Sequence, residues 1–296
     1  MSNTKYVLIT AARDEEEFIE ATLKSVVAQS LLPVKWVIIS DGSTDRTEAM
    51  VSEYAREHDF IKLIRLEAKE QRNFAAKVQA LKMGYEAVQD EEYDLIGNLD
   101  ADASFESDYY ERIIAEFDRN GKLGVAGGIT YDKIDDKFVQ VRAIENRVCG
   151  MIQMFRRECF EEIGGYLELR YGGEDTAASI MAMMNGWEVR TFLDIDAYHH
   201  RNRGISKNGY WQARTRQGMM FYQLGWSPLY MLLQTISRFS EKPWVWGSLV
   251  RFGSFFRAWL AREELMVSDE FVSYVLKEQR RSIKHVFYGD KLEAGS

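Results

Sequence analysis

A pair of carboxylates follows a short apolar run one third of the way along the chain. Asp100 and Asp102 come directly after residues 95–99, separated only by Ala101, so their like charges repel unless a cation relieves the repulsion. Oxygen ligands favour Mg²⁺ or Mn²⁺, and these ions commonly keep water and share coordination with phosphate oxygens. The pattern indicates a divalent cation with a diphosphate ligand, and it leaves open a solvated acidic turn.

A second acidic pair stands at the start of a segment whose composition favours a helix. Glu174 and Asp175 follow two glycines and precede residues 176–184, whose composition favours a helix. A carboxylate in this position could act as a general base. The alternative is that both residues only stabilise the positive end of the helix dipole, which is worth about 0.3–1 kcal/mol.

Two further polar motifs end strand-like runs. Residues 40–45 offer a glycine for a tight turn, and Asp41 at the strand tip could accept a hydrogen bond from a base or ribose, while Ser43 or Thr44 could simply cap the next helix. His199 and His200 end the strand-like residues 188–198. Because successive strand residues point to opposite faces, at most one of the two imidazoles should complete a metal shell, and a surface pair is the alternative.

The elements that must position these motifs alternate along the first half of the chain. Apolar strand runs and amphipathic helical runs succeed one another, and the segments are residues 6–9, 18–27, 36–39, 44–58, 61–66, 74–88 and 94–99. This order predicts an α/β fold with a doubly wound, parallel sheet. Ligands of such sheets bind beyond the carboxyl ends of the strands, where both acidic strand-end motifs fall.

The regular alternation is lost after residue 125, and beyond residue 204 the chain becomes aromatic and basic. Residues 201–296 carry 15 basic and 8 acidic side chains, a net charge of +7, which leaves −15 for residues 1–200. Helices are expected around residues 210–224, 228–239 and 243–261, followed by a charged tail from about Glu263. We expect a catalytic domain over residues 1–204 and a helical extension over residues 205–296.

Composition narrows the class of protein. With 296 residues, 46% of them hydrophobic and 28% charged, the chain is long enough to bury a core and is neither disordered nor fibrous. A formal charge of −8 is not that of a protein that coats nucleic acid. Cys149 and Cys159 lack the spacing of a thiolate zinc site or a disulfide framework. We expect a cytoplasmic, reducing setting, with no export signal and no segment that crosses a bilayer.

Taken in order, these motifs resemble those of the family 2 glycosyltransferases. The resemblance covers about residues 5–205 and is carried by Arg13-Asp14-Glu15, Ser40-Asp41-Gly42-Ser43-Thr44-Asp45, Asp100-Ala101-Asp102, Gly164-Gly165-Tyr166, Glu174-Asp175 and the histidine that follows. It implies the GT-A fold, in which helices flank a mixed, mainly parallel sheet. It also implies a nucleotide-diphosphate sugar donor, with a UDP-sugar favoured, and an inverting, metal-assisted transfer of one sugar to an acceptor hydroxyl.

The resemblance also implies roles for individual residues. Asp175, with Glu174 beside it, matches the catalytic base, and Asp102 matches the metal-binding position of the DXD motif. His199 matches the late histidine best, with His200 as the alternative metal ligand, and the metal is Mn²⁺ or Mg²⁺. Either Lys77 or Arg72 could meet the diphosphate. The residues expected to bind the nucleotide sugar are Ala11, Arg13, Glu15, Asp41, Lys77, Asp100 and Ala101.

Three departures limit what the resemblance implies. The family usually has asparagine where this chain has Asp14, and a second aspartate where it has Ser40, which weakens any inference about the nucleobase. Residues 212–216 only loosely resemble the Gln-x-x-Arg-Trp signature of polymer-forming members, so transfer of a single sugar is favoured. A sugar nucleotidyltransferase and a non-catalytic nucleotide-sugar-binding protein are the competing functions.

The composition of the C-terminal extension is compatible with more than one kind of partner. Its aromatic and basic composition is typical of helices at a membrane interface, and anionic lipid would suit its charge. The alternatives are that the aromatic side chains close the acceptor side of the catalytic domain or form an oligomer contact. We expect a glycan or lipid-linked acceptor, as in polysaccharide biosynthesis, and a peripheral contact at the inner face of the cell membrane.

Overall fold

The computed structural model describes residues 3–67, 74–134, 136–142, 146–201, 207–238 and 244–288. It divides into two compact units. The first comprises Met1–Glu168 and Glu174–Gly204, and the second comprises Leu169–Gly173 and Ile205–Ser296.

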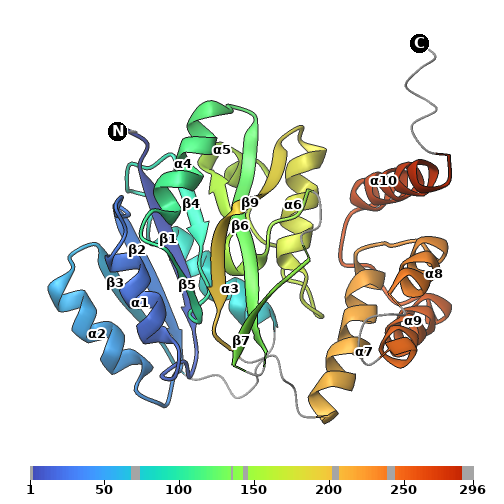
Figure 1. Ribbon diagram of the computed structural model, residues 1–296, viewed down its shortest axis with the longest axis horizontal. Helices are drawn as coiled ribbons and strands as arrows, with labels where there is room; N and C mark the ends of the chain where they lie inside the picture. Colours follow the sequence, from blue (N-terminus) through green and yellow to red (C-terminus); the bar gives the residue numbers. More distant parts are fainter. Residues whose placement is uncertain are drawn as a thin grey trace. The chain divides into compact units, whose positions relative to one another are not determined.

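The first unit combines strands and helices in the alternating order that the sequence predicts (Figure 1). Its elements are β1 (Tyr6–Ala12), α1 (Ile19–Val27), β2 (Lys35–Asp41), α2 (Thr47–Glu57), β3 (Ile61–Leu66), α3 (Phe74–Glu86), β4 (Leu95–Asn98), β5 (Ala103–Phe105), α4 (Tyr109–Arg119), β6 (Leu123–Ile134), β7 (Lys137–Gln140), the 3₁₀ helix η1 (Gly150–Ile152), β8 (Met154–Arg156), α5 (Arg157–Glu162), α6 (Glu174–Met184) and β9 (Glu188–His199).

One mixed sheet organises this unit. Within the described residues its strand order is β3-β2-β1-β4-β8-β6-β9-β5, with β7 paired to β6. Strands β1 to β4 are parallel, β8 runs antiparallel to both β4 and β6, and β9 is parallel to β6. It follows that β1, β2, β4, β6 and β9 all point the same way, so their carboxyl ends share one edge of the sheet. The predicted α/β fold with a mixed sheet flanked by helices is confirmed.

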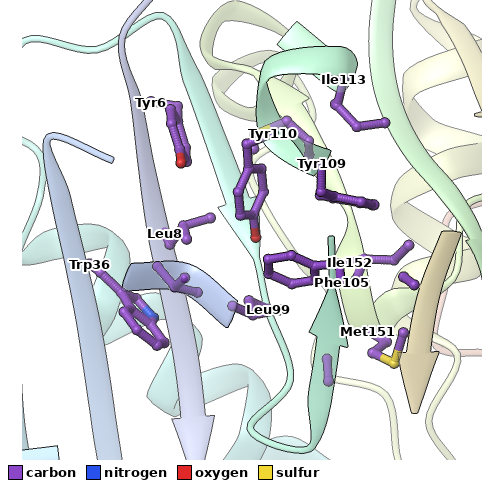
Figure 2. Close-up of a cluster of buried hydrophobic side chains, with 14 of the residues drawn as sticks. Tyr6, Leu8, Trp36, Leu99, Phe105, Tyr109, Tyr110, Ile113, Met151 and Ile152 are labelled. Carbon is purple, nitrogen blue, oxygen red and sulfur yellow. The ribbon is translucent and has the colours of Figure 1, made fainter. Parts of the chain in front are cut away.

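Alternating apolar residues on the strands give the sheet two buried faces. On β1, Tyr6 and Leu8 join one cluster, which Figure 2 shows together with Trp36 and Tyr109, while Val7 and Ile9 join the other. Helices α1, α2 and α4 contribute to the first cluster, and α3, α5 and α6 to the second. Because consecutive strand residues alternate between the faces, a continuous apolar run such as that of β1 requires helices on both sides.

The described helices of the second unit are α7 (Lys207–Gln223), α8 (Pro228–Ser237), α9 (Trp244–Ala261) and α10 (Asp269–Tyr288). The three helices expected in residues 210–261 are present with slightly different bounds, and the segment expected as a charged tail from about Glu263 contains a further helix, α10. Helix α10 buries Phe271, Val275 and Gln279, which recur every four residues. The uncharged run of residues 271–276 is shorter than a typical helix and has charged residues on both sides, so the sequence signal is weak. None of the described helices has both the length and the apolar character that a membrane span requires.

Candidate active site

The sequence motifs converge at the shared carboxyl edge of the sheet. Asp41 ends β2, Asp100 and Asp102 follow β4, and His199 ends β9. β9 lies between β6 and β5, and His199 is the register partner of Asp132 on β6 and of Ala103 on β5. This pairing brings Asp102, which directly precedes β5, beside His199.

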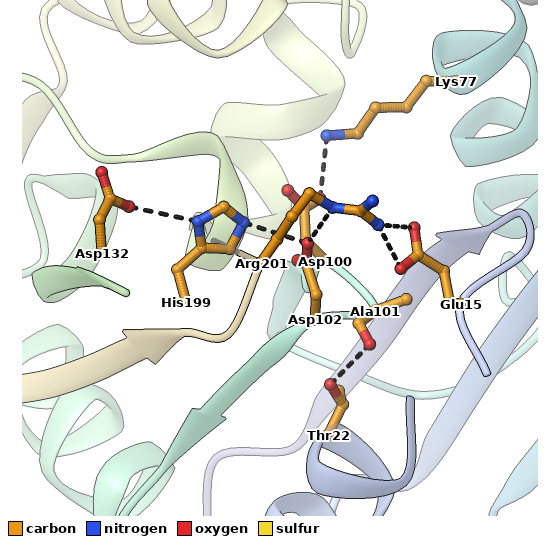
Figure 3. A network of polar contacts seen from close by, with 9 residues as sticks. All are labelled: Glu15, Thr22, Lys77, Asp100, Ala101, Asp102, Asp132, His199 and Arg201. Carbon is orange, nitrogen blue, oxygen red and sulfur yellow. Dashed lines mark hydrogen bonds and ion pairs between the residues drawn. The ribbon is translucent and has the colours of Figure 1, made fainter. Parts of the chain in front are cut away.

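Asp102 is the centre of a polar network (Figure 3). Its Oδ2 lies 3.1 Å from Nε2 of His199 and accepts a hydrogen bond of 2.9 Å from Nε of Arg201. Nη2 of Arg201 also donates to the carboxylate of Glu15, so the end of β1 is joined to the end of β9. Burial by itself would raise the pKa of Asp102, but His199 and Arg201 outweigh it and lower the pKa to about 2. Asp102 is therefore ionised at neutral pH.

Lys77 joins the two acidic motifs. Its Nζ on α3 lies 2.9 Å from Oδ1 of Asp100 and 3.8 Å from Oε1 of Glu174. Burial would lower the pKa of Lys77, but the charges of Asp100 and Glu174 raise it above its ordinary value. Burial raises the pKa of Glu174 in spite of the opposing charge of Lys77. The carboxylates after β4 and those at the start of α6 thus face one ammonium group.

Asp175 lies in the first turn of α6, held by backbone groups. Its Oδ2 accepts a hydrogen bond of 3.1 Å from the Gly150 amide, and its Oδ1 accepts one of 2.6 Å from the Thr176 amide. Gln153 supports this turn by donating to the Asp175 carbonyl oxygen at 3.1 Å, and it accepts a hydrogen bond from the Tyr166 hydroxyl at 2.9 Å. The Gly164-Gly165-Tyr166 motif thereby contributes to the placement of Asp175.

The loops after β1 and β2 are tied together by hydrogen bonds. Asp14 adopts a φ of 54°, a left-handed conformation that aspartate and asparagine tolerate best, and its Oδ1 accepts from the Thr44 amide at 2.8 Å. This explains physically why aspartate can stand in the usual asparagine position.

Ser40, the other departure, donates from its hydroxyl to Oε1 of Glu48 at 2.7 Å. Asp45 accepts a hydrogen bond of 2.9 Å from the Thr47 amide in the turn that leads into α2. The N-cap of α2 is Arg46, without a side-chain hydrogen bond, so the alternative with Ser43 or Thr44 as the cap is wrong.

The remaining predicted binding residues lie along the same edge. Arg13 and Asp41 form an ion pair with 3.4 Å between Nη1 and Oδ2. Ala11 is on β1, where it pairs with Ile39 of β2. The carbonyl oxygen of Ala101 accepts a hydrogen bond of 2.9 Å from the hydroxyl of Thr22 on α1 (Figure 3), which orients the turn between the two aspartates. Arg72, the alternative diphosphate contact, lies outside the described residues.

The two histidines separate as strand geometry requires. His199 faces Asp102, whereas Nε2 of His200 lies 2.6 Å from the Ser104 hydroxyl and its ring contacts Phe138. Burial lowers the pKa of His200. Of the two imidazoles, His199 is the one that the fold brings to the Asp-x-Asp motif.

Two charged residues at this site were missed in the sequence. Arg201 follows the histidines directly, and a basic residue next to an expected acidic cluster could have indicated it. Asp132 is 9% exposed at the end of an otherwise apolar strand, where an isolated acidic residue is a weak but visible signal. Neither belongs to a motif that the sequence analysis used.

The donor set at Asp102 and His199 suits a divalent cation that keeps other ligands. Octahedral ligands at the 2.0–2.1 Å typical of Mg²⁺ lie about 3 Å from their neighbours, close to the 3.1 Å between Asp102 Oδ2 and His199 Nε2. Within the described part of the chain, no group of three or more histidine, cysteine, aspartate or glutamate side chains is arranged to hold a metal ion. These two donors therefore fit an ion that shares its coordination with water and phosphate oxygens.

Comparisons with known proteins find similar sequences and structures. The family model described as Glycosyl transferase family 2 matches residues 7–162, just over half of the chain. Poly-beta-1,6-N-acetyl-D-glucosamine synthase of Staphylococcus epidermidis is 25% identical over 201 residues, which cover 62% of this chain and 46% of that protein. The chain thus spans about half the length of the curated relatives it matches.

Solved structures with the same fold cover most of the chain. The mannosyltransferase PcManGT from Pyrobaculum calidifontis, in complex with GDP-Man and Mn²⁺, has a TM-score of 0.57 and 16% identity, covering 98% of this chain and 89% of its own. Staphylococcus aureus TarS 1–349, in complex with UDP-GlcNAc, has a TM-score of 0.54 and 15% identity, covering 96% and 82%. At these identities the likeness establishes the fold, which is that of GT-A glycosyltransferases.

Proposed function

Since the chain belongs to Glycosyl transferase family 2 and is a glycosyltransferase, we propose that it transfers one sugar from a UDP-sugar to an acceptor hydroxyl, with inversion at the anomeric carbon. The observation that carries this proposal is the position of Lys77 between Asp100 and Glu174. Lys77 thereby connects Asp100, in the motif suited to the donor diphosphate, with Glu174, in the motif suited to activating the acceptor hydroxyl. The UDP-GlcNAc bound by TarS and the N-acetylglucosamine polymer named for the curated relatives support a UDP-sugar as donor.

Asp175 is the proposed general base. It accepts the proton of the attacking hydroxyl, while the Gly150 and Thr176 amides hold its carboxylate in one orientation. Glu174, whose pKa is raised by burial, lies beside it and pairs with Lys77. Attack from the side opposite the departing diphosphate gives inversion.

The proposed contacts with the donor lie along the carboxyl edge of the sheet. We assign the nucleobase and ribose to the region of Asp41, Arg13 and Ala11, and the diphosphate to Lys77 and the turn at Asp100 and Ala101. The positive charge of Lys77, which its neighbours maintain, suits the diphosphate. Glu15 contributes by holding Arg201 at the same edge.

Asp102 and His199 are the residues that would hold Mn²⁺ or Mg²⁺, as their spacing and chemistry suit. Such an ion neutralises the charge on the departing diphosphate. The Mn²⁺ in the PcManGT complex supports this proposal.

The second unit is proposed to contact the surface of an anionic bilayer. The outward side of α9 exposes Trp246, Leu249, Phe256 and Leu260, although an exposed helix face is ordinarily polar. Residues 201–296 carry a net charge of +7, which complements anionic lipid. A lipid-linked or cell-surface glycan is accordingly the proposed acceptor.

The test is a screen of the purified protein against a panel of UDP- and GDP-sugars with Mn²⁺ or Mg²⁺, measuring release of the nucleoside diphosphate. We expect release from a UDP-sugar. A nucleotidyltransferase would instead consume a nucleoside triphosphate and release pyrophosphate, and a non-catalytic protein would bind the donor without turnover. Either result contradicts the proposal.

The base is tested by Asp175→Asn. We expect a 10²–10⁴-fold loss of turnover, the usual range for general base catalysis, with donor binding retained. Asp90→Asn is the matched control, because Asp90 is exposed before β4 at the opposite edge of the sheet. Turnover of Asp175→Asn equal to that of the control would remove Asp175 from this role.

A further inference from the structure

Asp132 is a buried carboxylate that the proposed reaction does not yet use. It lies near the carboxyl end of β6, and only 9% of its surface is exposed. A carboxylate is rarely buried to this extent unless it is paired or hydrogen-bonded. Its Oδ1 lies 3.2 Å from Nδ1 of His199, which is also buried.

The sheet itself produces this contact. Asp132 and His199 are Cα partners in the parallel pairing of β6 with β9, so their side chains extend from neighbouring strands on the same face. On the other side of β9, Nε2 of the same ring meets Oδ2 of Asp102 at 3.1 Å. Figure 3 shows the three side chains in a row, with the ring in the middle.

We propose that Asp132 is a positioning residue for the metal site, an inference that rests on the proposed metal-assisted transfer. Asp132 accepts the Nδ1 proton of His199 and so fixes both the tautomer and the orientation of the ring. The lone pair of Nε2 is then left facing Asp102, where the cation binds. Carboxylates that hold a ligating histidine in this way raise the basicity of the ring and contribute strongly to metal affinity.

The arrangement on β9 distinguishes His199 from its neighbour. His200 points to the other face and meets the neutral hydroxyl of Ser104. Of these two rings, that of His199 has one nitrogen beside Asp132, outside the Asp-x-Asp motif, and the other beside Asp102 of the motif. The cation site is thus proposed to extend from β5 through β9 to β6.

The experiment measures Mn²⁺ affinity of the full chain with UDP, by electron paramagnetic resonance of free Mn²⁺. We expect Asp132→Ala to weaken binding about 10–100-fold, the range found when such supporting carboxylates are removed. Asp132→Asn should recover most of that loss, because its amide oxygen still accepts the Nδ1 proton. Asp136→Ala is the control: it removes the same charge from the exposed turn after β6 and should bind as the unchanged protein does.

A double-mutant cycle tests whether Asp132 acts through the ring. In the His199→Ala background, Asp132→Ala should cause no further loss of Mn²⁺ affinity. Pulsed spectra of bound Mn²⁺ should show a coupling to imidazole ¹⁴N in the unchanged protein and in Asp132→Asn, and should lack it in Asp132→Ala and His199→Ala. Thermal unfolding confirms that each variant is folded.

The outcomes distinguish a failure of His199 as the proposed metal ligand from a failure of the role proposed for Asp132. If His199→Ala binds Mn²⁺ as tightly as the unchanged protein, the proposed metal ligand fails, and the role of Asp132 fails with it. If His199→Ala loses affinity while Asp132→Ala does not, only the role of Asp132 is overturned. Equal losses in Asp132→Asn and Asp132→Ala would indicate a general effect of charge and would also overturn it.

Discussion

At the scale of single residues, the site is a set of opposite charges in contact. Lys77 faces Asp100 and Glu174, and Arg201 faces Asp102 and Glu15. Like charges brought together at one sheet edge would repel if these cations were absent. A cation is also suited to a diphosphate, so Lys77, which stabilises the site, is also the residue proposed to bind the donor diphosphate.

Replacement of Lys77 by methionine tests how much the pairing of these opposite charges contributes to the stability of the protein. The change leaves Asp100 and Glu174 without their shared cation, and we expect unfolding free energy at pH 7 to fall by about 1–2 kcal/mol, between the values of exposed and buried pairs. About a third of the Lys77 side chain is exposed, which keeps the loss moderate. Urea unfolding monitored by circular dichroism measures it. Lys82→Met, on the exposed side of α3, is the control and should change stability by less than about 0.5 kcal/mol.

The pH dependence of this difference follows from the raised pKa of Lys77. A cation whose pKa is higher in the folded state contributes stability fully below its ordinary pKa and loses that contribution as pH rises through the folded value. The difference between the unchanged protein and Lys77→Met should therefore be the same at pH 7 and pH 9. A difference that disappears by pH 9 would contradict the stabilised ammonium.

At the scale of elements, two helices of the second unit are in close contact through a glycine. A Cβ on Gly218 of α7 would lie 2.0 Å from Ser254 Oγ and 2.1 Å from the carbonyl oxygen of Arg251, both on α9. Both distances are shorter than any real contact, so the helices must separate to accept a side chain. Gly253 on α9 has no heavy atom within 4 Å of the equivalent position.

These two glycines give a matched pair of substitutions. We expect Gly218→Ala to destabilise the second unit by about 1–3 kcal/mol through overpacking. Gly253→Ala should stabilise it by about 0.5–1 kcal/mol, because alanine loses less entropy than glycine within a helix. Tryptophan fluorescence during urea unfolding reports mainly this unit, which contains five of the seven tryptophans. Equal effects of the two changes would contradict the close packing of α7 and α9.

At the scale of the whole molecule, charge and apolar surface are divided between the two parts of the chain. Residues 1–200 carry most of the acidic side chains, while residues 201–296 carry a net positive charge. Exposed apolar side chains also extend along α8, where Leu229, Leu232 and Ile236 recur at helical spacing. Together with the outward side of α9, they support the proposed contact with anionic lipid.

Vesicle flotation tests this contact. The full chain should float with vesicles that contain anionic lipid, and less so at high salt. Trp246→Asp combined with Leu260→Asp should lower partitioning by more than about tenfold, since burial of each such side chain is worth roughly 1.5–3 kcal/mol. Leu193→Asp is the control, because Leu193 on β9 is 64% exposed, as Leu260 is at 63%. Flotation that is unchanged in the double variant would disprove the contact.

Much of the first unit could be predicted from local patterns. The apolar run of β1 and the strand ends at Asp41 and Asp100 are visible because a strand buried on both faces is continuously apolar and ends at a polar turn. Helix α10 is hard to predict because the uncharged residues 271–276 are fewer than a typical helix needs and are flanked on both sides by charged residues. Local signals place the start of α2 three residues early, since Ser43 and Thr44 are both plausible caps, whereas the helix begins after Arg46, which caps it with no side-chain hydrogen bond.

By itself, the sequence determined which residues end strands and carry chemistry, because helical and strand periods and turn residues act over a few positions of the chain. Only the tertiary structure decided which of them meet. The insertion of β9 between β6 and β5 sets His199 between Asp132 and Asp102, residues 67 and 97 positions away. Such register is set by the packing of distant strands, which no local pattern records.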